Sequence, residues 1–146
     1  MQTVNIYVAQ NSPFILQWYT TLKSLHPDWQ ISVVIPDSQK SWISKAFHIG
    51  DKITARFYDP LSGVTSNTQQ TPNDWVLLNG NDFTELADVG TPSTCTNIGL
   101  HHVAGEDPVD LVISGPNLGR NSSTVFTLGS GTIGGALEAA LVLCPY

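Results

Sequence analysis

Short apolar runs recur along the chain and alternate with stretches of helical periodicity. Four of these runs are residues 4–9 (VNIYVA), 31–35 (ISVVI), 75–78 (WVLL) and 109–113 (VDLVI). Nearly continuous apolar runs of this length, bounded by turn residues, predict strands that are buried on both faces. Residues 53–57 (ITARF) alternate between apolar and polar, which predicts a strand with one exposed face.

Helix starts are marked twice by a capping residue followed by proline, at Ser12-Pro13 and at Thr91-Pro92. The first helix should end near His26-Pro27, and the second should run to residue 103. A third helix is predicted after the glycine-rich residues 129–132, and residues 122–128 before it read as a possible strand. The apolar residues expected to face inward on this last helix are Ile133, Ala136, Leu137, Ala140 and Leu141.

The alternation of buried strands and amphipathic helices predicts the fold class. Such chains form a mostly parallel sheet covered by helices on both faces. Residues 4–35 should form one βαβ unit, and residues 59–73 should form a polar loop. A length of 146 residues suits a single α/β domain spanning residues 1–146.

The loops that follow parallel strands meet at one edge of the sheet, where α/β folds bind ligands. The loop 114–121 (SGPNLGRN), shaped by its two glycines and its proline, has the richest chemistry, because it combines the amides of Asn117 and Asn121 with the guanidinium of Arg120. Its alternative interpretation is an ordinary turn after a core strand. Ser41 and Asn117 offer oxygen ligands of the kind that bind Mg²⁺, Mn²⁺ or Ca²⁺. Hard cations normally require carboxylates, and Asp37 is the nearest acid in these loops.

Composition and charge exclude several classes of function. The net charge is −6, and five of the six basic residues lie between residues 23 and 56, so non-specific nucleic-acid binding is not expected. No apolar run approaches the ~20 residues of a membrane span. The N-terminus has no basic segment followed by an apolar one, so we expect no signal peptide and predict a cytoplasmic protein.

Residues 129–134 (GSGTIG) match the G-x-G-x-x-G pattern of dinucleotide-binding loops. That reading requires a following strand with an acid about 20 residues on, for which the 12 residues after Gly134 leave no room. A helix N-terminus with hydroxyls at Ser130 and Thr132, which would bind an oxyanion, is the better interpretation. Trp42 could stack on a ring of a ligand, although capping the core is favoured, and Cys95 is expected to be a small buried hydrophobe.

Four stretches of the chain resemble the SurE family of survival-protein phosphatases, in its fungal acid-phosphatase-like branch. They are ISVVIPDSQKSWISKAFHI (31–49), GTPSTCTNIGLHHV (90–103), DLVISGPNLGRN (110–121) and GSGTIGGALEAAL (129–141). The resemblance implies a Rossmann-like, three-layer α/β/α fold. It also implies a hydrolase that depends on a divalent metal, Mg²⁺ or Mn²⁺, and acts on phosphate monoesters such as nucleoside 5′-monophosphates.

The resemblance also assigns roles to individual residues. Ser41 and Asn117 match the family's metal-ligand serine and asparagine. Ser130 and Thr132 are implied to act in catalysis by holding phosphoryl oxygens. The implied phosphate-binding residues are Gly129, Ser130, Gly131, Thr132 and Arg120.

The chain departs from the family pattern at three places. The family's first strand ends in Asn-Asp-Asp-Gly, whose aspartates hold the metal, whereas residues 9–13 here are AQNSP. Residues 81–89 (NDFTELADV) resemble an insertion, and the C-terminal part of the family fold is expected to be missing. Mis-splicing, truncation and a degenerate paralogue all remain open as explanations, and the family's homo-oligomer is not expected.

These departures bear on the expected function. Without the acidic pair, a serine and an asparagine would hold a dication weakly, so hydrolysis should be impaired. The alternative is an inactive domain that binds a small phosphorylated ligand or a protein partner.

Overall fold

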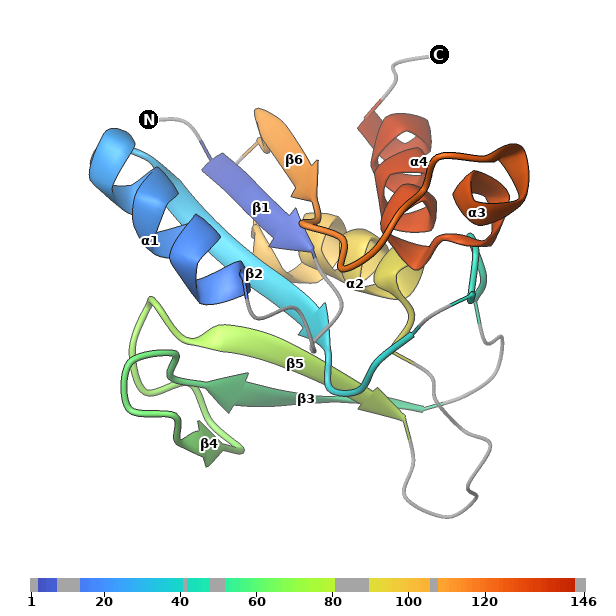
Figure 1. Ribbon diagram of the computed structural model, residues 1–146. Helices are drawn as coiled ribbons and strands as arrows, with labels where there is room; N and C mark the ends of the chain where they lie inside the picture. Colours follow the sequence, from blue (N-terminus) through green and yellow to red (C-terminus); the bar gives the residue numbers. More distant parts are fainter. Residues whose placement is uncertain are drawn as a thin grey trace.

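The computed structural model describes residues 3–7, 14–40, 42–47, 52–80, 90–105 and 108–143, with residues 3–7 described by their backbone. The chain folds into a central sheet with helices on both sides (Figure 1). The elements in order are β1 (Thr3–Tyr7), α1 (Ile15–Leu25), β2 (Gln30–Pro36), β3 (Ile53–Tyr58), β4 (Thr65–Ser66), β5 (Trp75–Gly80), α2 (Pro92–Ile98), the π-helix η1 (Gly99–Val103), β6 (Leu111–Ser114), α3 (Thr124–Gly129) and α4 (Gly131–Leu143).

The sheet has the strand order β4-β3-β5-β2-β1-β6 and is mostly parallel. Strands β5, β2, β1 and β6 run parallel to their neighbours, while β3 runs antiparallel to β5 and to the short β4. In register, Val4 of β1 pairs with Ile31 of β2 on one side and with Leu111 of β6 on the other. The expected α/β class and the parallel pairing of the first βαβ unit are therefore confirmed.

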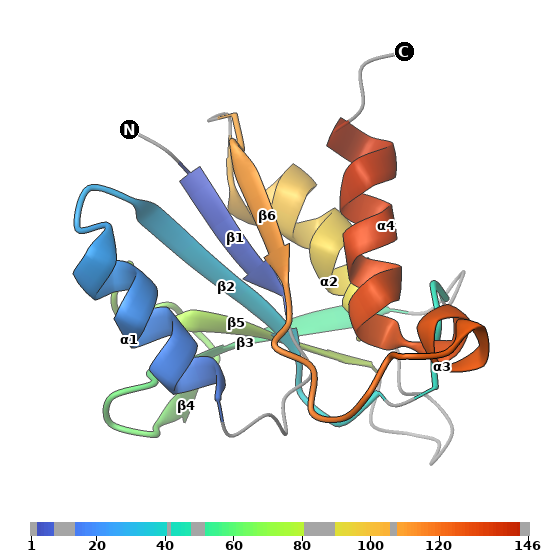
Figure 2. The ribbon, with the colours of Figure 1, turned by 45° about the horizontal axis from the view of Figure 1, so that its top comes forward.

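Strand β2 lies at the centre of the fold, and its alternate residues pack against different layers. Val33 lies on the face of the sheet that α1 covers. There it belongs to one buried cluster with Tyr19 of α1 and Trp75 of β5. Val34 faces the other way and packs with Cys95 of α2. Figure 2 shows α1 on one side of the sheet and both α2 and α4 on the other. This is the three-layer arrangement that continuous apolar strands predict.

Helix α2 begins as the sequence predicts. Thr91 is extended and its hydroxyl accepts a hydrogen bond from the Thr94 amide at 3.1 Å, which is the geometry of an N-cap. The helix widens into η1, which carries His101 and His102 as an exposed pair. Cys95 is fully buried, as expected, and burial raises the pKa of its thiol well above the ordinary value.

Two expectations for the last third of the chain are wrong. Residues 122–128 do not form a strand but enter helix α3, because Ser123 is extended and its hydroxyl caps the amide of Phe126 at 3.3 Å. Helix α4 also presents a different face from the one expected. Leu137 and Leu141 remain 49% and 57% exposed, whereas Gly134, Gly135 and Glu138 face inward.

Smaller differences concern element boundaries. The last strand, expected at residues 109–113, is β6 at Leu111–Ser114, and the polar loop 59–73 contains the two-residue β4. The predicted insertion at 81–89 and the cap at Ser12-Pro13 lie outside the described residues. None of the helices described is both long enough and apolar enough to cross a membrane.

Candidate functional site

A pocket of about 260 Å³ opens at the carboxyl edge of the parallel strands. In the sheet, β2 and β5 lie to one side of β1, whereas β6 lies to its other side. The direction in which successive strands are added therefore reverses at β1. This reversal of strand order is the point at which open α/β sheets bind ligands. The loops that follow β2 and β6, together with the start of α4, line the pocket. Its size suits a small molecule.

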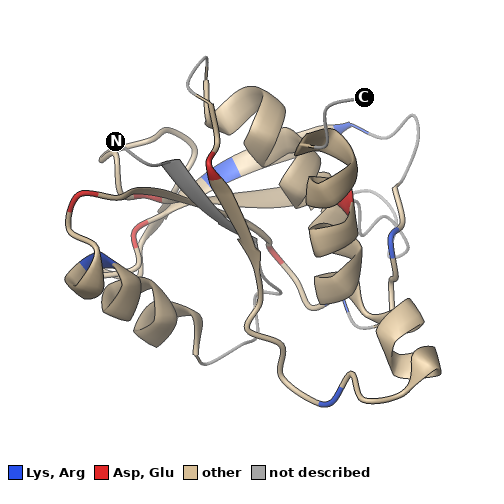
Figure 3. Cartoon of the chain, turned by 90° about the horizontal axis from the view of Figure 1, so that it is seen from above, with Lys and Arg blue, Asp and Glu red and all other residues tan. Residues whose placement is uncertain are grey.

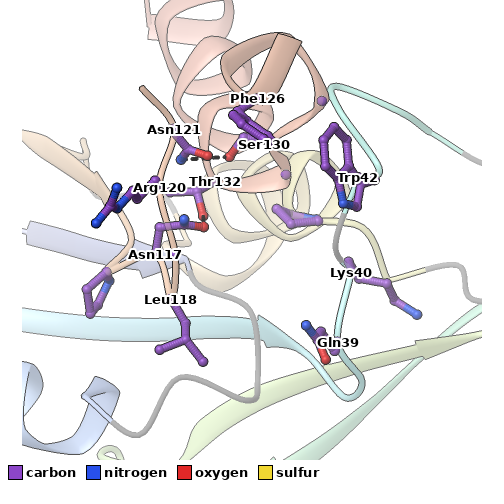
Figure 4. Close-up of a pocket in the computed structure, with 15 residues that line it drawn as sticks. Gln39, Lys40, Trp42, Asn117, Leu118, Arg120, Asn121, Phe126, Ser130 and Thr132 are labelled. Atoms are coloured by element: carbon purple, nitrogen blue, oxygen red, sulfur yellow. Dashed lines mark hydrogen bonds between the residues drawn. The ribbon is translucent and has the colours of Figure 1, made fainter. Parts of the chain in front are cut away.

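One wall of the pocket is polar and is built from the loop after β6 and the first turn of α4 (Figure 4). The Thr132 hydroxyl donates a hydrogen bond to Oδ1 of Asn117 at 3.1 Å. The Asn121 side-chain amide donates to Oγ of Ser130 at 3.1 Å. Two side-chain hydrogen bonds therefore fix the loop against the start of α4.

The loop after β6 needs its glycines. Gly115 and Gly119 have φ values of +132° and +127°, which other residues rarely adopt, and the Gly115-Pro116 peptide bond is cis. The Ser114 hydroxyl also donates to the Thr132 carbonyl at 2.7 Å, which joins the end of β6 directly to α4. Glycine at these two positions therefore gives the loop its shape.

The start of α4 offers donors to a ligand. The first amides of a helix have no intrahelical partner and carry a partial positive charge. Oγ of Ser130 accepts from the Ile133 amide at 3.3 Å, as an N-cap does, and the Ser130 carbonyl accepts from the Gly134 amide at 2.9 Å. Gly131 and Thr132 follow Ser130 and line the pocket, so this end of the helix can bind an oxyanion.

The opposite wall comes from the loop after β2 and carries Trp42 (Figure 4). This loop contacts α4 through glycines. A Cβ at Gly134 would lie 2.2 Å from the Ser44 carbonyl oxygen, and one at Gly131 would lie 3.0 Å from the Lys40 carbonyl oxygen. Gly131 and Gly134 of the G-x-G-x-x-G pattern therefore serve this close contact, whereas Gly129 meets the Trp42 ring. A helix precedes these glycines where the dinucleotide motif requires a strand.

A partly buried ion pair holds the same loop in place. Lys45 Nζ lies 2.7 Å from Oε2 of Glu138, whose other oxygen accepts a hydrogen bond from the Asn97 side chain at 2.9 Å. The Thr91 hydroxyl donates to the Ala46 carbonyl at 2.6 Å. These contacts tie the loop to α2 and α4, so the two walls of the pocket keep a fixed separation.

The charges near the pocket are few. Its described lining includes no Asp or Glu, and charged residues are sparse over the molecule (Figure 3). Asp37 pairs with Arg56 at 3.4 Å. Arg120 lines the pocket, but its side chain points away from Trp42 (Figure 4). Lys40 is buried and donates to the Ser38 hydroxyl at 2.6 Å.

A divalent cation does not fit the donor set that the structure describes. The described ranges contain no group of three or more His, Cys, Asp and Glu side chains that could hold a metal. Oδ1 of Asn117 already accepts the Thr132 hydroxyl, and Asn117 is neutral. Ser41 lies outside the described residues, as do residues 8–13, whose sequence VAQNSP includes no acid. The metal-ligand roles of Ser41 and Asn117 remain predictions.

The structure brings most of the predicted site residues together. Asn117 and Arg120 share the pocket with Gly129, Ser130, Gly131 and Thr132, although they are up to 15 residues apart in sequence. Sequence reasoning named Asn121 as a polar residue of the loop but did not foresee Ser130 as its partner, and it missed Phe126 because residues 122–128 read as a strand. The capping pattern at Ser123 was the signal that could have revealed α3.

Comparisons with known proteins place the chain among related sequences. The family model described as "Survival protein SurE" matches residues 9–145. The chain is 32% identical to "5′-nucleotidase SurE" of Methanocaldococcus jannaschii over 88% of its own length and 41% of that protein. It is 35% identical to "Probable tubulin--tyrosine ligase PBY1" of Saccharomyces cerevisiae over 90% of its own length and 19% of that protein.

A solved structure shows the same fold. The crystal structure of the SurE protein from Aquifex aeolicus superposes with a TM-score of 0.67 at 27% identity, covering 97% of this chain and 48% of that one. The chain therefore spans less than half the length of each of these three proteins.

Proposed function

The chain belongs to the SurE family, and we propose that its pocket binds the phosphoryl group of a small phosphate monoester. The observation that carries the proposal is the polar wall formed by the start of α4 and the loop after β6. Helix amides, hydroxyls and an amide side chain are the groups that bind phosphate without a surrounding basic field. Ligands of this class include nucleoside 5′-monophosphates, as the names of the nucleotidase relatives suggest.

The proposed roles follow from position in the pocket. The amides of Gly131 and Thr132 donate to phosphoryl oxygens, and so does the Ser130 hydroxyl, which accepts from Asn121 and Ile133 and keeps its own proton for the ligand. The Thr132 hydroxyl can donate to the ligand only by exchanging Asn117 Oδ1 for a phosphoryl oxygen. Asn117 holds the Thr132 hydroxyl in place. Arg120, on the outer side of the loop, contributes a long-range positive charge. Gly129 permits the close approach of the opposite wall.

We further propose that this chain hydrolyses its ligand slowly. A divalent ion in a phosphatase polarises the phosphoryl group and supplies an activated water. Neutral donors at Ser41 and Asn117 would bind such an ion weakly, because hard cations take carboxylates. Asn11 and Ser12 stand near the place where the family pattern has its two aspartates. Binding of a phosphorylated ligand without efficient turnover is therefore the expected behaviour.

Hydrolysis of p-nitrophenyl phosphate tests this account. The natural chain and the double variant Asn11→Asp/Ser12→Asp are compared with and without Mn²⁺ or Mg²⁺. We expect turnover near background for the natural chain and metal-dependent turnover for the variant. Metal-dependent turnover by the natural chain would contradict slow hydrolysis. If both chains are inactive, the aspartate pair does not explain the defect, and the binding proposal is judged by titration with inorganic phosphate.

A further inference from the structure

Trp42 and Phe126 form an aromatic pair at the mouth of the pocket. Their ring centroids lie 5.3 Å apart with the planes tilted by 52°. Trp42 is 62% exposed and Phe126 is 44% exposed. Trp42 therefore does not cap the core, which was the favoured interpretation of the sequence. An exposed tryptophan that lines a pocket beside a second exposed ring is suited to contact a ligand.

The backbone and a glycine fix the position of the Trp42 ring. Trp42 has a φ of +62°, a value that is uncommon for a bulky residue and costs free energy. The ring lies directly on Gly129, where a Cβ would approach Cε3 of Trp42 to 2.7 Å. The Ser44 amide donates to the Gly129 carbonyl at 3.0 Å, which anchors the loop beside the ring. The loop thus holds the indole beside α4 instead of allowing it to turn into the core.

Trp42 stands opposite the polar wall, and Phe126 adjoins that wall. In Figure 4, Trp42 lies on the other side of the pocket from Asn117 and Thr132, and Phe126 lies beyond Ser130. A phosphoryl group held at the start of α4 would leave its ester group directed into the space between these walls. A planar ester group there would contact the exposed indole, whereas a short aliphatic group would not.

We propose that Trp42 and Phe126 select phosphate esters that carry an aromatic ring, either a nucleobase or an aryl group. This inference rests on the proposed function, because it takes the phosphoryl group to bind at the start of α4. Ring stacking recognises the flat face of any base, so the preference covers aromatic esters in general and not one nucleotide. Trp42 acts here as a specificity-determining residue.

Calorimetric titration with four ligands tests the inference: inorganic phosphate, ethyl phosphate, phenyl phosphate and AMP. We expect phenyl phosphate and AMP to bind about tenfold more tightly than ethyl phosphate. Trp42→Ala should remove that preference and leave the affinity for inorganic phosphate unchanged, and Trp42→Phe should retain most of it. Trp18→Ala is the matched control, because Trp18 is also exposed but lies on α1. Circular dichroism establishes that each variant is folded.

The outcomes separate this inference from the proposed function. Equal affinity for ethyl and phenyl phosphate, with clear binding of inorganic phosphate, overturns the aromatic preference alone. A Trp42→Ala variant that weakens all four ligands equally also overturns it, since the residue then has only a structural role. If none of the four ligands binds to the natural chain, the proposed function and this inference both fail.

Discussion

Replacing Gly134 by alanine tests whether α4 and the loop after β2 meet through direct backbone contact. The new Cβ would lie 2.2 Å from the carbonyl oxygen of Ser44 and 2.7 Å from its carbonyl carbon. Ordinary contacts between such atoms lie at about 3.5 Å. The loop would therefore have to move by roughly 1 Å, because the obstructing atoms are backbone and cannot rotate away.

Three terms set the size of the effect. Alanine is a better helix former than glycine by about 1 kcal/mol, which favours the variant. Overpacking a tight contact costs about 1–3 kcal/mol. Displacing the loop also weakens the 3.0 Å hydrogen bond from the Ser44 amide to Gly129, a loss of about 1 kcal/mol. The sum is a net destabilisation of about 1–3 kcal/mol, or a melting temperature lower by roughly 3–10 °C.

Urea unfolding followed by far-ultraviolet circular dichroism measures this difference. Ala140→Gly is the matched control, because Ala140 is exposed on the same helix and its replacement should cost only the propensity term of about 1 kcal/mol. If Gly134→Ala is as stable as the natural chain or more stable, helix propensity dominates. The close contact between α4 and the loop would then be refuted.

Three further predictions concern stability and reactivity. Glu138→Gln removes the negative partner of the partly buried ion pair and should destabilise the chain by about 1–2 kcal/mol. The loss stays below that of a fully buried pair because the partially exposed lysine can turn to water, and a change below about 0.5 kcal/mol in urea unfolding would contradict this prediction. The hydrogen bond from the Thr71 hydroxyl, together with nearby amides, lowers the pKa of Asp74. The ionised Asp74 carboxylate therefore stabilises the fold above the ordinary carboxyl pKa, and this stabilisation is lost as pH falls through the lowered pKa. Asp74→Asn should therefore lose less stability than the natural chain between neutral and acid pH, and identical urea midpoint shifts would count against the interpretation. Burial raises the pKa of the Cys95 thiol, and a Cys144→Ser variant leaves Cys95 as the one cysteine of the chain. This variant should react with a disulfide reagent at pH 8 only after denaturation, and rapid reaction of the folded chain would argue against a buried thiol.

The hydrophobic pattern predicts the sheet well because its central strands are buried on both faces. Runs such as residues 31–35 and 75–78 are continuously apolar, and only an α/β/α arrangement covers both of their faces. The N-cap at Thr91 was equally clear from its sequence, since threonine followed by proline marks a helix start. Local chemistry and tertiary packing agree at these positions.

The pattern fails where small residues decide the packing. In α4 the expected inner face held Leu137 and Leu141, but Gly134 and Gly135 face inward because α2 and the loop after β2 approach too closely for larger side chains. The apolar residues of α3 resemble a strand in isolation, and only the cap at Ser123 distinguishes the helix. Hydrophobicity measures affinity for a core and does not register a close approach of backbones.

The candidate site was predictable in part for the same reasons. Sequence spacing placed Asn117 and Thr132 at the same edge of the sheet, and the structure joins them by a hydrogen bond. The exposure of Trp42 could not be predicted, because it depends on a positive φ and on the contact with Gly129. Such features appear only when two distant segments are placed together.

Nuclear magnetic resonance titration of the ¹⁵N-labelled chain with phenyl phosphate would locate the bound phosphate ester residue by residue. We expect saturable amide shifts centred on residues 129–132 and 116–121, with the largest changes at Gly131 and Thr132 and smaller ones at Lys40 and Trp42. An absence of shifts at millimolar ligand would contradict the claim that this pocket binds phosphate monoesters. Shifts confined to residues away from the pocket, such as those of helix α1, would contradict it equally.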